Sequence, residues 1–315
     1  MRYAIRCVIG LTLFGVILIN LDLGMLAESF RRISWATAGA ALGLFVVSCG
    51  VAVAKWRLLW HRASWMHMLS ANFVAQFYSL ALPGQIAGEI VKSLRLGARF
   101  SDTTNVAASV IVDRATGLLG LLILGAVGAS LSVRAIASEA VVVLLVSVAG
   151  VLVVLLAIAY RPFFAASSSL ISRFGERVPL FEPLSRRSLE LMKAWASLLG
   201  KPIVTGASIL MGVVFQAVCI AVNIVVARGL GIDLSFADWC WVFSAVTVAV
   251  LLPVTVGGIG IREGVYVVLL GRLGVSSEQA VTMSMTVFGV SFIGVLIGAA
   301  LEGAYHLRVR EQPID

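Results

Sequence analysis

Long apolar runs separated by short polar segments organise this chain from end to end. A bilayer span needs roughly 17–25 mostly apolar residues. Six runs meet that length and predict spans at 5–22, 34–54, 104–131, 139–160, 203–228 and 279–304. The first run follows two arginines and so resembles a secretory signal, but Met25-Leu26-Ala27 is a poor cleavage site. We therefore interpret it as a retained span.

Two further apolar stretches, 68–99 and 239–271, are each too long for one span and are interrupted near the middle. The residues that break them are Pro83, Gly84, Pro253 and Gly257. Irregular backbone at bilayer depth is tolerated only where protein covers it or a water-filled cavity faces it. We predict that each stretch forms a re-entrant hairpin of two half-helices, and a fully spanning path remains the alternative.

The two broken stretches match each other at an offset of 170 residues. The matched pairs are Phe73 with Phe243, Leu82 with Leu252, Pro83 with Pro253, Gly88 with Gly258 and Lys92 with Arg262. The same offset carries the span at 34–54 onto the one near 203, and the span at 104–131 onto the last. Paired Gly/Pro-interrupted segments in corresponding halves are the best sequence pointer to a transporter binding site.

These patterns predict an all-α polytopic membrane protein with about six full spans and two re-entrant hairpins. Residues 1–315 are expected to form a single transmembrane domain. Within it, 34–131 and 203–304 each read as span, hairpin and span, and together they form an inverted repeat. Between the repeats, 161–202 interleaves leucines with arginines and predicts a basic amphipathic connector on the cytoplasmic leaflet.

Composition supports a membrane protein and narrows the remaining classes. The chain is 60% hydrophobic and 13% charged, whereas soluble domains are about 45–50% apolar and about 25% charged. The net charge of +8 fits the positive-inside rule, and no basic soluble module is present to bind nucleic acid. Most of the 24 Lys and Arg residues fall on one side, which predicts that both termini are cytoplasmic. The five tryptophans near segment ends are expected to be interfacial anchors, namely Trp56, Trp60, Trp65, Trp239 and Trp241.

Metal, redox and nucleotide chemistry find no support in the sequence. The four cysteines and three histidines lie in or beside apolar runs and show no ligand or redox spacing. The Gly257-Gly258-Ile259-Gly260 run follows no predicted strand and precedes no Gly-Lys-Ser/Thr, so it is not a nucleotide loop. We expect no cofactor, no metal and no enzymatic activity.

Charged residues inside the apolar segments are the candidate site. Each costs about 2.5–3.5 kcal/mol on insertion scales and normally faces a cavity or a partner. Arginine can hold a phosphate as a bidentate fork, and half-helix N-termini beside glycine turns add backbone N–H donors. The substrate-binding candidates are Lys92, Arg95, Arg114 and Arg262 with Gly88 and Gly258, and the orienting or proton-coupling candidates are Glu89, Asp113 and Glu263.

Spacing predicts how these charges pair. Glu89 and Lys92 are three residues apart and share one helical face. Asp113 and Arg114 are neighbours whose side chains point about 100° apart, so we expect them to contact other segments. Lys92, Arg114 and Arg262 together are expected to cradle a phosphate. The alternative is that all these groups are buried ion pairs that lock the hairpins to the bundle.

Three motifs resemble the lysylphosphatidylglycerol synthase transmembrane family, also described as flippase-like integral membrane proteins. They are Leu82-Pro83-Gly84 through Gly88-Glu89 and Lys92, then Asp113-Arg114, and then Leu252-Pro253 through Gly257-Gly258-Ile259-Gly260-Ile261-Arg262-Glu263. In multiple-peptide-resistance-factor proteins such a region moves aminoacylated phosphatidylglycerol between leaflets, beside a soluble domain that makes this lipid. The resemblance implies lipid translocation in a bacterial inner membrane.

The chain departs from the family pattern at two points. It ends at Asp315, shortly after the last predicted span, so we expect no synthase domain and a lipid-modifying enzyme encoded separately as a candidate partner. It also carries Ala87 where the family pattern has a second glycine. The identity of the lipid and the oligomeric state are not readable from the sequence.

Four functions follow from these observations. The first is a flippase or scramblase that moves a phosphate-headgroup lipid, either a phospholipid or a polyprenyl-phosphate carrier, by alternating access. The second is a proton- or ion-coupled transporter of a soluble anion. The third is a membrane-embedded enzyme acting on lipid headgroups. The sequence argues against it, because it shows no candidate nucleophile and no metal site. The fourth is a non-catalytic partner in an envelope-lipid synthesis complex.

Overall fold

The computed structural model describes residues 2–19, 21–82, 86–132, 142, 146, 149–150, 182–251 and 254–310. Every regular element in these ranges is an α-helix, which confirms the all-α membrane class. Helices suit this setting because they satisfy their own backbone polar groups away from water. They are α1 (Arg2–Ile19), α2 (Leu23–Arg32), α3 (Trp35–Leu59), α4 (Trp65–Ala81), α5 (Ile86–Phe100), α6 (Thr103–Leu131), α9 (Glu182–Leu199), α10 (Pro202–Gly229), α11 (Phe236–Leu251), α12 (Ile261–Arg272) and α13 (Ser277–Arg310).

Four helices are long and apolar enough to cross a membrane. They are α3, α6, α10 and the Ser277–Tyr305 part of α13, and they match four of the six predicted spans. The predicted span at 5–22 corresponds to α1, which joins α2 through a bend of 97°. That pair would be a fifth span. The predicted span at 139–160 lies mostly outside the described residues.

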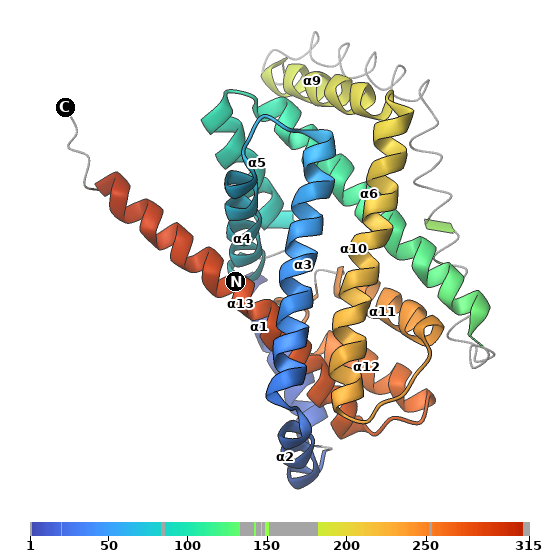
Figure 1. The fold of residues 1–315 in the computed structure, drawn as a ribbon. Coiled ribbons are helices and arrows are strands. Elements are labelled where there is room, and N and C mark those ends of the chain that lie inside the picture. The colour runs from blue at the N-terminus through green and yellow to red at the C-terminus, as the bar shows by residue number, and fades with distance from the viewer. Residues whose placement is uncertain are drawn as a thin grey trace.

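Both predicted hairpins are pairs of shorter helices broken near the expected residues. α4 ends at Ala81 and α5 begins at Ile86, whereas α11 ends at Leu251 and α12 begins at Ile261. In each pair the two helices contact each other and return toward the side they came from (Figure 1). Pro83, Gly84, Leu252 and Pro253 themselves lie outside the described residues.

The turn of the second hairpin meets the end of α4, the first helix of the other hairpin, inside the bundle. Gly257 in the second turn has φ +63°, and a Cβ added there would lie 2.6 Å from Leu80 Cδ1 at the end of α4. α1 covers the same turn, because a Cβ on Gly10 would lie 3.2 Å from the Ile259 carbonyl oxygen. Glycine is required at Gly257 because a left-handed backbone and a close neighbour coincide there.

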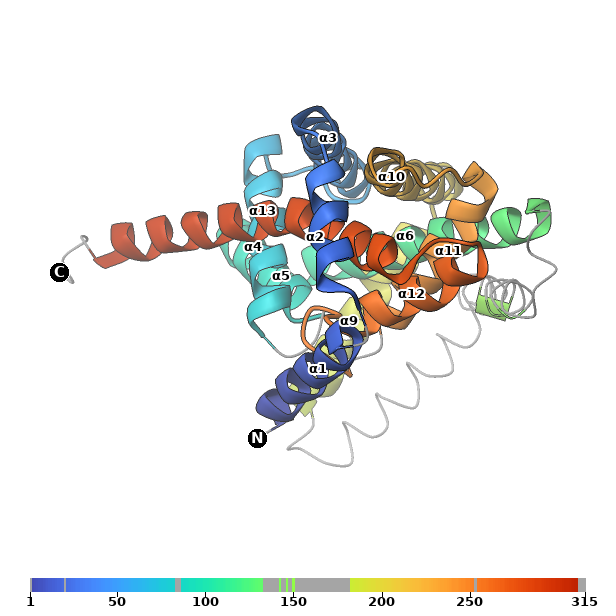
Figure 2. The same cartoon turned by 90° about the horizontal axis from the view of Figure 1, so that it is seen from below.

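Each long helix that follows a hairpin packs against the other hairpin (Figure 2). α13 crosses α4 at Gly298, where an added Cβ would lie 2.1 Å from the Phe73 carbonyl oxygen. α6 crosses α11 at Gly128, where it would lie 2.6 Å from the Ala237 carbonyl oxygen. Small residues allow this close approach of helix backbones, so the two halves interlock.

α9 lies across one end of the bundle and contacts α6 and α10 (Figure 1). It accounts for part of the predicted connector at 161–202, and residues 161–181 lie outside the described part. The tryptophan expectation was wrong for four of the five residues. Trp65 is exposed, but Trp56, Trp60, Trp239 and Trp241 are buried in the two hydrophobic cores of the bundle.

Candidate functional site

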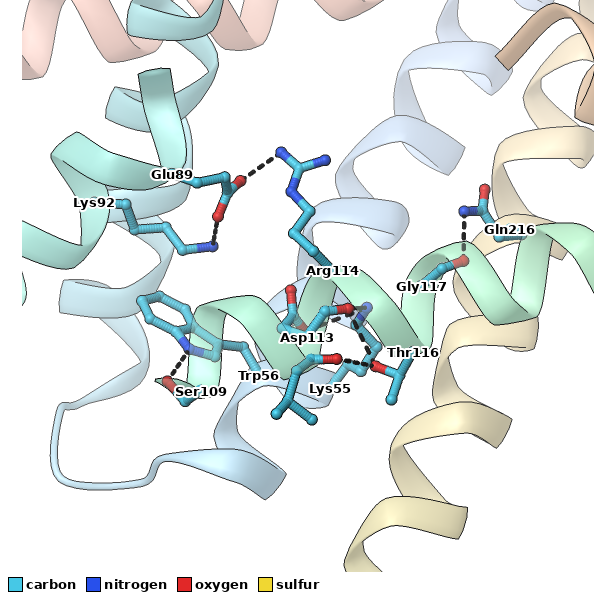
Figure 3. Close-up of polar contacts among 11 residues, drawn as sticks. Lys55, Trp56, Glu89, Lys92, Ser109, Asp113, Arg114, Thr116, Gly117 and Gln216 are labelled. Atoms are coloured by element: carbon cyan, nitrogen blue, oxygen red, sulfur yellow. Dashed lines mark hydrogen bonds and ion pairs between the residues drawn. The ribbon is translucent and has the colours of Figure 1, made fainter. Parts of the chain in front are cut away.

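Glu89 stands at the centre of the most extensive set of charges in the described part of the chain. It lies in the first turn of α5, and its carboxylate accepts a hydrogen bond from Arg114 Nη2 at 2.5 Å (Figure 3). The other carboxylate oxygen is 3.0 Å from Lys92 Nζ, one turn further along α5. The predicted pairing of Glu89 with Lys92 is therefore confirmed. One carboxylate links two cations from two helices.

Asp113, next to Arg114 on α6, turns toward α3 instead. Lys55 Nζ lies 3.2 Å from Asp113 Oδ1 and donates to the Asp113 main-chain oxygen at 2.7 Å. Neighbouring side chains on a helix diverge, so the two residues contact different helices, as predicted (Figure 3). We refer to Lys55, Glu89, Lys92, Asp113 and Arg114 as the first charge cluster.

Aromatic rings shield the two lysines of the first charge cluster. Lys92 Nζ lies 4.1 Å from the centroid of the Trp56 ring, and Lys55 Nζ lies 5.9 Å from that of Phe215. An ammonium over a ring face is stabilised by the ring quadrupole, more strongly when water is excluded. The Trp56 ring is fixed in turn, because its Nε1 donates to Ser109 Oγ at 3.0 Å.

The first charge cluster has three cations and two carboxylates, so its formal charge is +1. Lys55 and Lys92 side chains are 5% and 4% exposed, and both carboxylates are 13% exposed. Arg114 differs, with 55% of its side chain exposed. Glu89 Oε2 and Asp113 Oδ1 are within ion-pair distance of the lysines, yet neither has a well-aligned hydrogen bond. The cluster therefore has one accessible cation and unused acceptor capacity.

Arg262 and Glu263 form a second charge cluster with Ser284 of α13. The Arg262 guanidinium donates to Glu263 Oε1 at 2.9 Å and to Ser284 Oγ at 3.1 Å. Ser284 Oγ donates to the same carboxylate oxygen at 2.8 Å. The other oxygen, Oε2, accepts from the Gly260 backbone N–H at 2.7 Å and so caps the start of α12. Among the described residues, the hydrogen-bond donors to the Glu263 carboxylate all come from its own hairpin or from α13.

The second charge cluster is neutral and more enclosed than the first. Glu263 is 1% exposed, the Arg262 side chain is 15% exposed, and its guanidinium lies 4.5 Å from the Phe288 ring centroid. Glu263 and Ser284 hold Arg262 on the second hairpin, whereas Lys92 and Arg114 both pair with Glu89 of the first. A common phosphate cradle of these three cations stays a prediction.

Arg95 lies one turn after Lys92 on α5 and has a partner of its own on α13. Its guanidinium forms an ion pair with Glu302 and lies 4.3 Å from the centroid of the Tyr305 ring. Tyr78 of α4 donates to the same glutamate at 3.1 Å. A pocket of about 320 Å³ beside this pair is lined by Val91, Leu94, Arg95, Glu302 and Tyr305.

The predicted glycines have packing or turn roles in the structure. A Cβ on Gly88 would lie 2.0 Å from the Ala75 carbonyl oxygen, so this residue lets α5 pack closely on α4. Gly258 has φ +75° and lies against Val250 within the second turn. A role for either backbone in substrate binding stays a prediction.

Comparison of the chain with models of known protein families shows to which family it belongs. A sequence model described as the lysylphosphatidylglycerol synthase TM region matches residues 3–299. The chain belongs to this family. The match confirms the resemblance and, together with the apolar helices, shows an integral membrane protein. Searches of curated proteins and of solved structures found no significant match.

Three partners of the candidate residues were missed by the sequence analysis, namely Lys55, Ser284 and Glu302. Lys55 was placed in a loop because the predicted span ended at 54, whereas α3 continues to Leu59. Glu302 lies inside the predicted last span, and an acid at that depth was a sufficient signal. Ser284 is uncharged, so nothing in the sequence marked it. No group of three or more His, Cys, Asp and Glu side chains among the described residues could hold a metal ion.

Proposed function

We propose that this protein moves a lipid with an anionic phosphate headgroup between the leaflets of a membrane. The observation that carries the proposal is the first charge cluster, which combines two buried lysines with one accessible arginine and has a formal charge of +1. Ionisable groups at bilayer depth are costly and generally functional. Membership in a family named for a lipid synthase's membrane region supports the same class of substrate.

The arrangement suggests how a phosphate would bind. Arg114 is the most exposed member of the cluster, and its partner Glu89 stays attached to Lys92 if Arg114 leaves. A phosphate oxygen pair fits the planar guanidinium fork. In this proposal Arg114 exchanges the Glu89 carboxylate for the phosphate, and Lys92 holds Glu89 in place. Proton coupling through Glu89 remains a further proposal.

An inverted repeat would supply alternating access. When the bounds of the four helices α3 to α6 are shifted by 170 residues, α3 falls on α10, α4 on α11, α5 on α12 and α6 on α13 to within a few residues at most ends. α3 runs away from α2 whereas its neighbour α10 runs back toward that end (Figure 1). Two hairpins that enter from opposite sides, with the second turn lying against the end of α4, fit a transporter whose two halves move about a shared midplane site.

α13 offers a mechanical link between the two hairpins. Ser284 contacts the second hairpin through Arg262, and Glu302 contacts the first through Arg95. The two contacts are about 27 Å apart along a helix that rises 1.5 Å per residue. A rigid helix attached at both points would make the opening of one hairpin depend on the other.

The cellular setting belongs to the same proposal. We place the protein in a bacterial inner membrane with cytoplasmic termini, because the Lys and Arg distribution follows the positive-inside rule. We assign it a non-catalytic role in which a separate lipid-modifying enzyme supplies the substrate.

Reconstitution into liposomes with headgroup-labelled lipids tests the proposal. The panel contains a phospholipid, a polyprenyl phosphate and a lipid with a neutral headgroup, each scored for leaflet exchange with and without a pH gradient. We expect exchange of the phosphate lipids only, and an effect of the gradient would indicate proton coupling. Exchange of no lipid in the panel would overturn the proposal and favour soluble-anion transport or a scaffolding role.

A further inference from the structure

We propose a second phosphate-binding site, separate from the first charge cluster, in the pocket beneath α9. The pocket lies where the end of α3, the start of α6 and the last turns of α9 come together, and it has a volume of about 250 Å³. Its lining consists of Leu59, Trp60, His61, Arg62, Asp102, Asn105, Ala194, Ser197, Leu198 and Lys201. It shares no residue with the first charge cluster.

The single carboxylate of the pocket is already occupied. Asp102 accepts from Trp60 Nε1 at 3.0 Å and from Asn105 Nδ2 at 2.6 Å. Arg62 Nη1 lies 3.2 Å from the same side chain. Three donors from two segments therefore neutralise and orient Asp102, and it has little capacity left for a further cation.

The remaining basic groups have no such partner. Lys201 lies between α9 and α10 and makes no ion pair or side-chain hydrogen bond among the described residues, and the same holds for His61. With Arg62 shared and Lys201 unpaired, the pocket has more positive than negative charge. An anion in the pocket would receive Lys201 and Arg62 as charged donors and Ser197 as a neutral one.

The apolar part of the lining narrows the ligand class. Leu59, Trp60 and Leu198 are apolar, and the first two are buried. Small-molecule sites usually have about 300–1,000 Å³, so this pocket suits a compact phosphate with a short apolar attachment. Two sources offer that chemistry: the headgroup of an anionic phospholipid at the membrane surface, and free phosphate.

Such a ligand would attach the connector to the transmembrane bundle. α9 supplies one wall of the pocket, while α3 and α6 supply the other. α3 and α6 also carry Lys55, Asp113 and Arg114 of the first charge cluster. Anionic lipid in one leaflet attracts basic interfacial segments, and a phosphate in this pocket would hold α9 against the ends of those two helices.

Native mass spectrometry of the purified full chain tests the site. The protein is titrated with phosphatidylglycerol and, in a separate arm, with inorganic phosphate, and bound ligand is counted for each variant. We expect Lys201→Gln to weaken binding about tenfold or more, the loss of one charge-assisted hydrogen bond. The matched control is Lys193→Gln, which removes an exposed lysine from α9 that does not line the pocket.

The outcomes separate the possibilities. Loss of phosphatidylglycerol binding in Lys201→Gln but not in Lys193→Gln supports a lipid headgroup, and the same pattern with inorganic phosphate alone supports a soluble ligand. Equal binding by both variants and the unmodified protein overturns the site. If Lys201→Gln does not fold, Ser197→Ala removes the exposed neutral donor of the lining and makes the same test. Leaflet exchange is scored independently, so failure here leaves the transport proposal standing.

Discussion

The two charge clusters differ in how their arginines are held. Arg114 reaches from α6 to a carboxylate on α5, and 55% of its side chain remains exposed. Arg262 binds the carboxylate next to it and is 15% exposed, and it also donates to Ser284 and lies over the ring of Phe288. A cation that joins two helices and faces outward can exchange its partner at low cost, whereas an enclosed and saturated one cannot.

This difference suggests different roles for the two arginines, whereas both were expected from the sequence to bind a phosphate. The first charge cluster has a spare positive charge and suits an anionic ligand. The second is neutral, and its Glu263 caps the helix that carries it. In the proposed function, substrate contact therefore belongs to the first hairpin, and the second charge cluster anchors the turn of the second hairpin.

Removal of Glu263 should produce the largest effect on stability. Glu263→Ala leaves Arg262 enclosed without its carboxylate and removes the cap on Gly260. Breaking a buried ion pair by deleting one partner costs about 3–5 kcal/mol. Thermal unfolding in detergent, followed by circular dichroism, should show a clear decrease in unfolding temperature.

Glu28→Ala is the matched control for that change. Glu28 pairs with Arg32 at 2.8 Å, but the two side chains are 65% and 57% exposed. Exposed pairs contribute under about 1 kcal/mol, so the unfolding temperature should hardly move. A Glu263→Ala protein as stable as this control would show that the second cluster is not an anchor.

Interlocking of the two halves predicts the next largest effect. Gly298→Ala places a Cβ 2.1 Å from the Phe73 carbonyl oxygen and forces α13 away from α4. Overpacking of this kind typically costs about 1–3 kcal/mol. Gly289→Ala on the same helix meets nothing within 4 Å and should be neutral or stabilising by up to about 1 kcal/mol. Equal unfolding temperatures for the two variants would refute the close crossing.

The contact of the second hairpin turn with the end of α4 predicts a smaller effect on stability. Gly257 has φ +63° and lies against Leu80, so Gly257→Ala adds a left-handed backbone cost of about 1–2 kcal/mol. Gly271→Ala, in the last turn of α12 with open space around it, is the control. If both variants unfold at the wild-type temperature, the turn does not need a glycine there.

Local signals made the hairpins predictable. Proline and glycine interrupt helices through their own backbone geometry, so the breaks after Ala81 and after Leu251 follow from the sequence alone. Helix geometry likewise predicted that Asp113 and Arg114 contact different segments. The pairs within one helix, such as Glu89 with Lys92, needed only spacing.

Contacts between distant helices were not predictable in the same way. Lys55 meets Asp113 across 58 residues, and Arg95 meets Glu302 across 207. These pairs depend on the tilt and rotation of whole helices, which packing rather than local sequence sets. The different partners of Arg262 and Lys92, which match at the 170-residue offset, have the same origin, because matched positions need not have the same neighbours.

Leaflet exchange and unfolding temperature measured together on Arg114→Ala and Arg262→Ala test the central claim most directly. Arg99→Ala, which removes an exposed cation near the end of α5, is the control. We predict that Arg114→Ala loses exchange about tenfold or more, as expected for a lost charged contact, and unfolds at the wild-type temperature. Arg262→Ala should instead unfold at a lower temperature. Wild-type exchange by a folded Arg114→Ala protein would contradict the assignment of substrate binding to the first charge cluster.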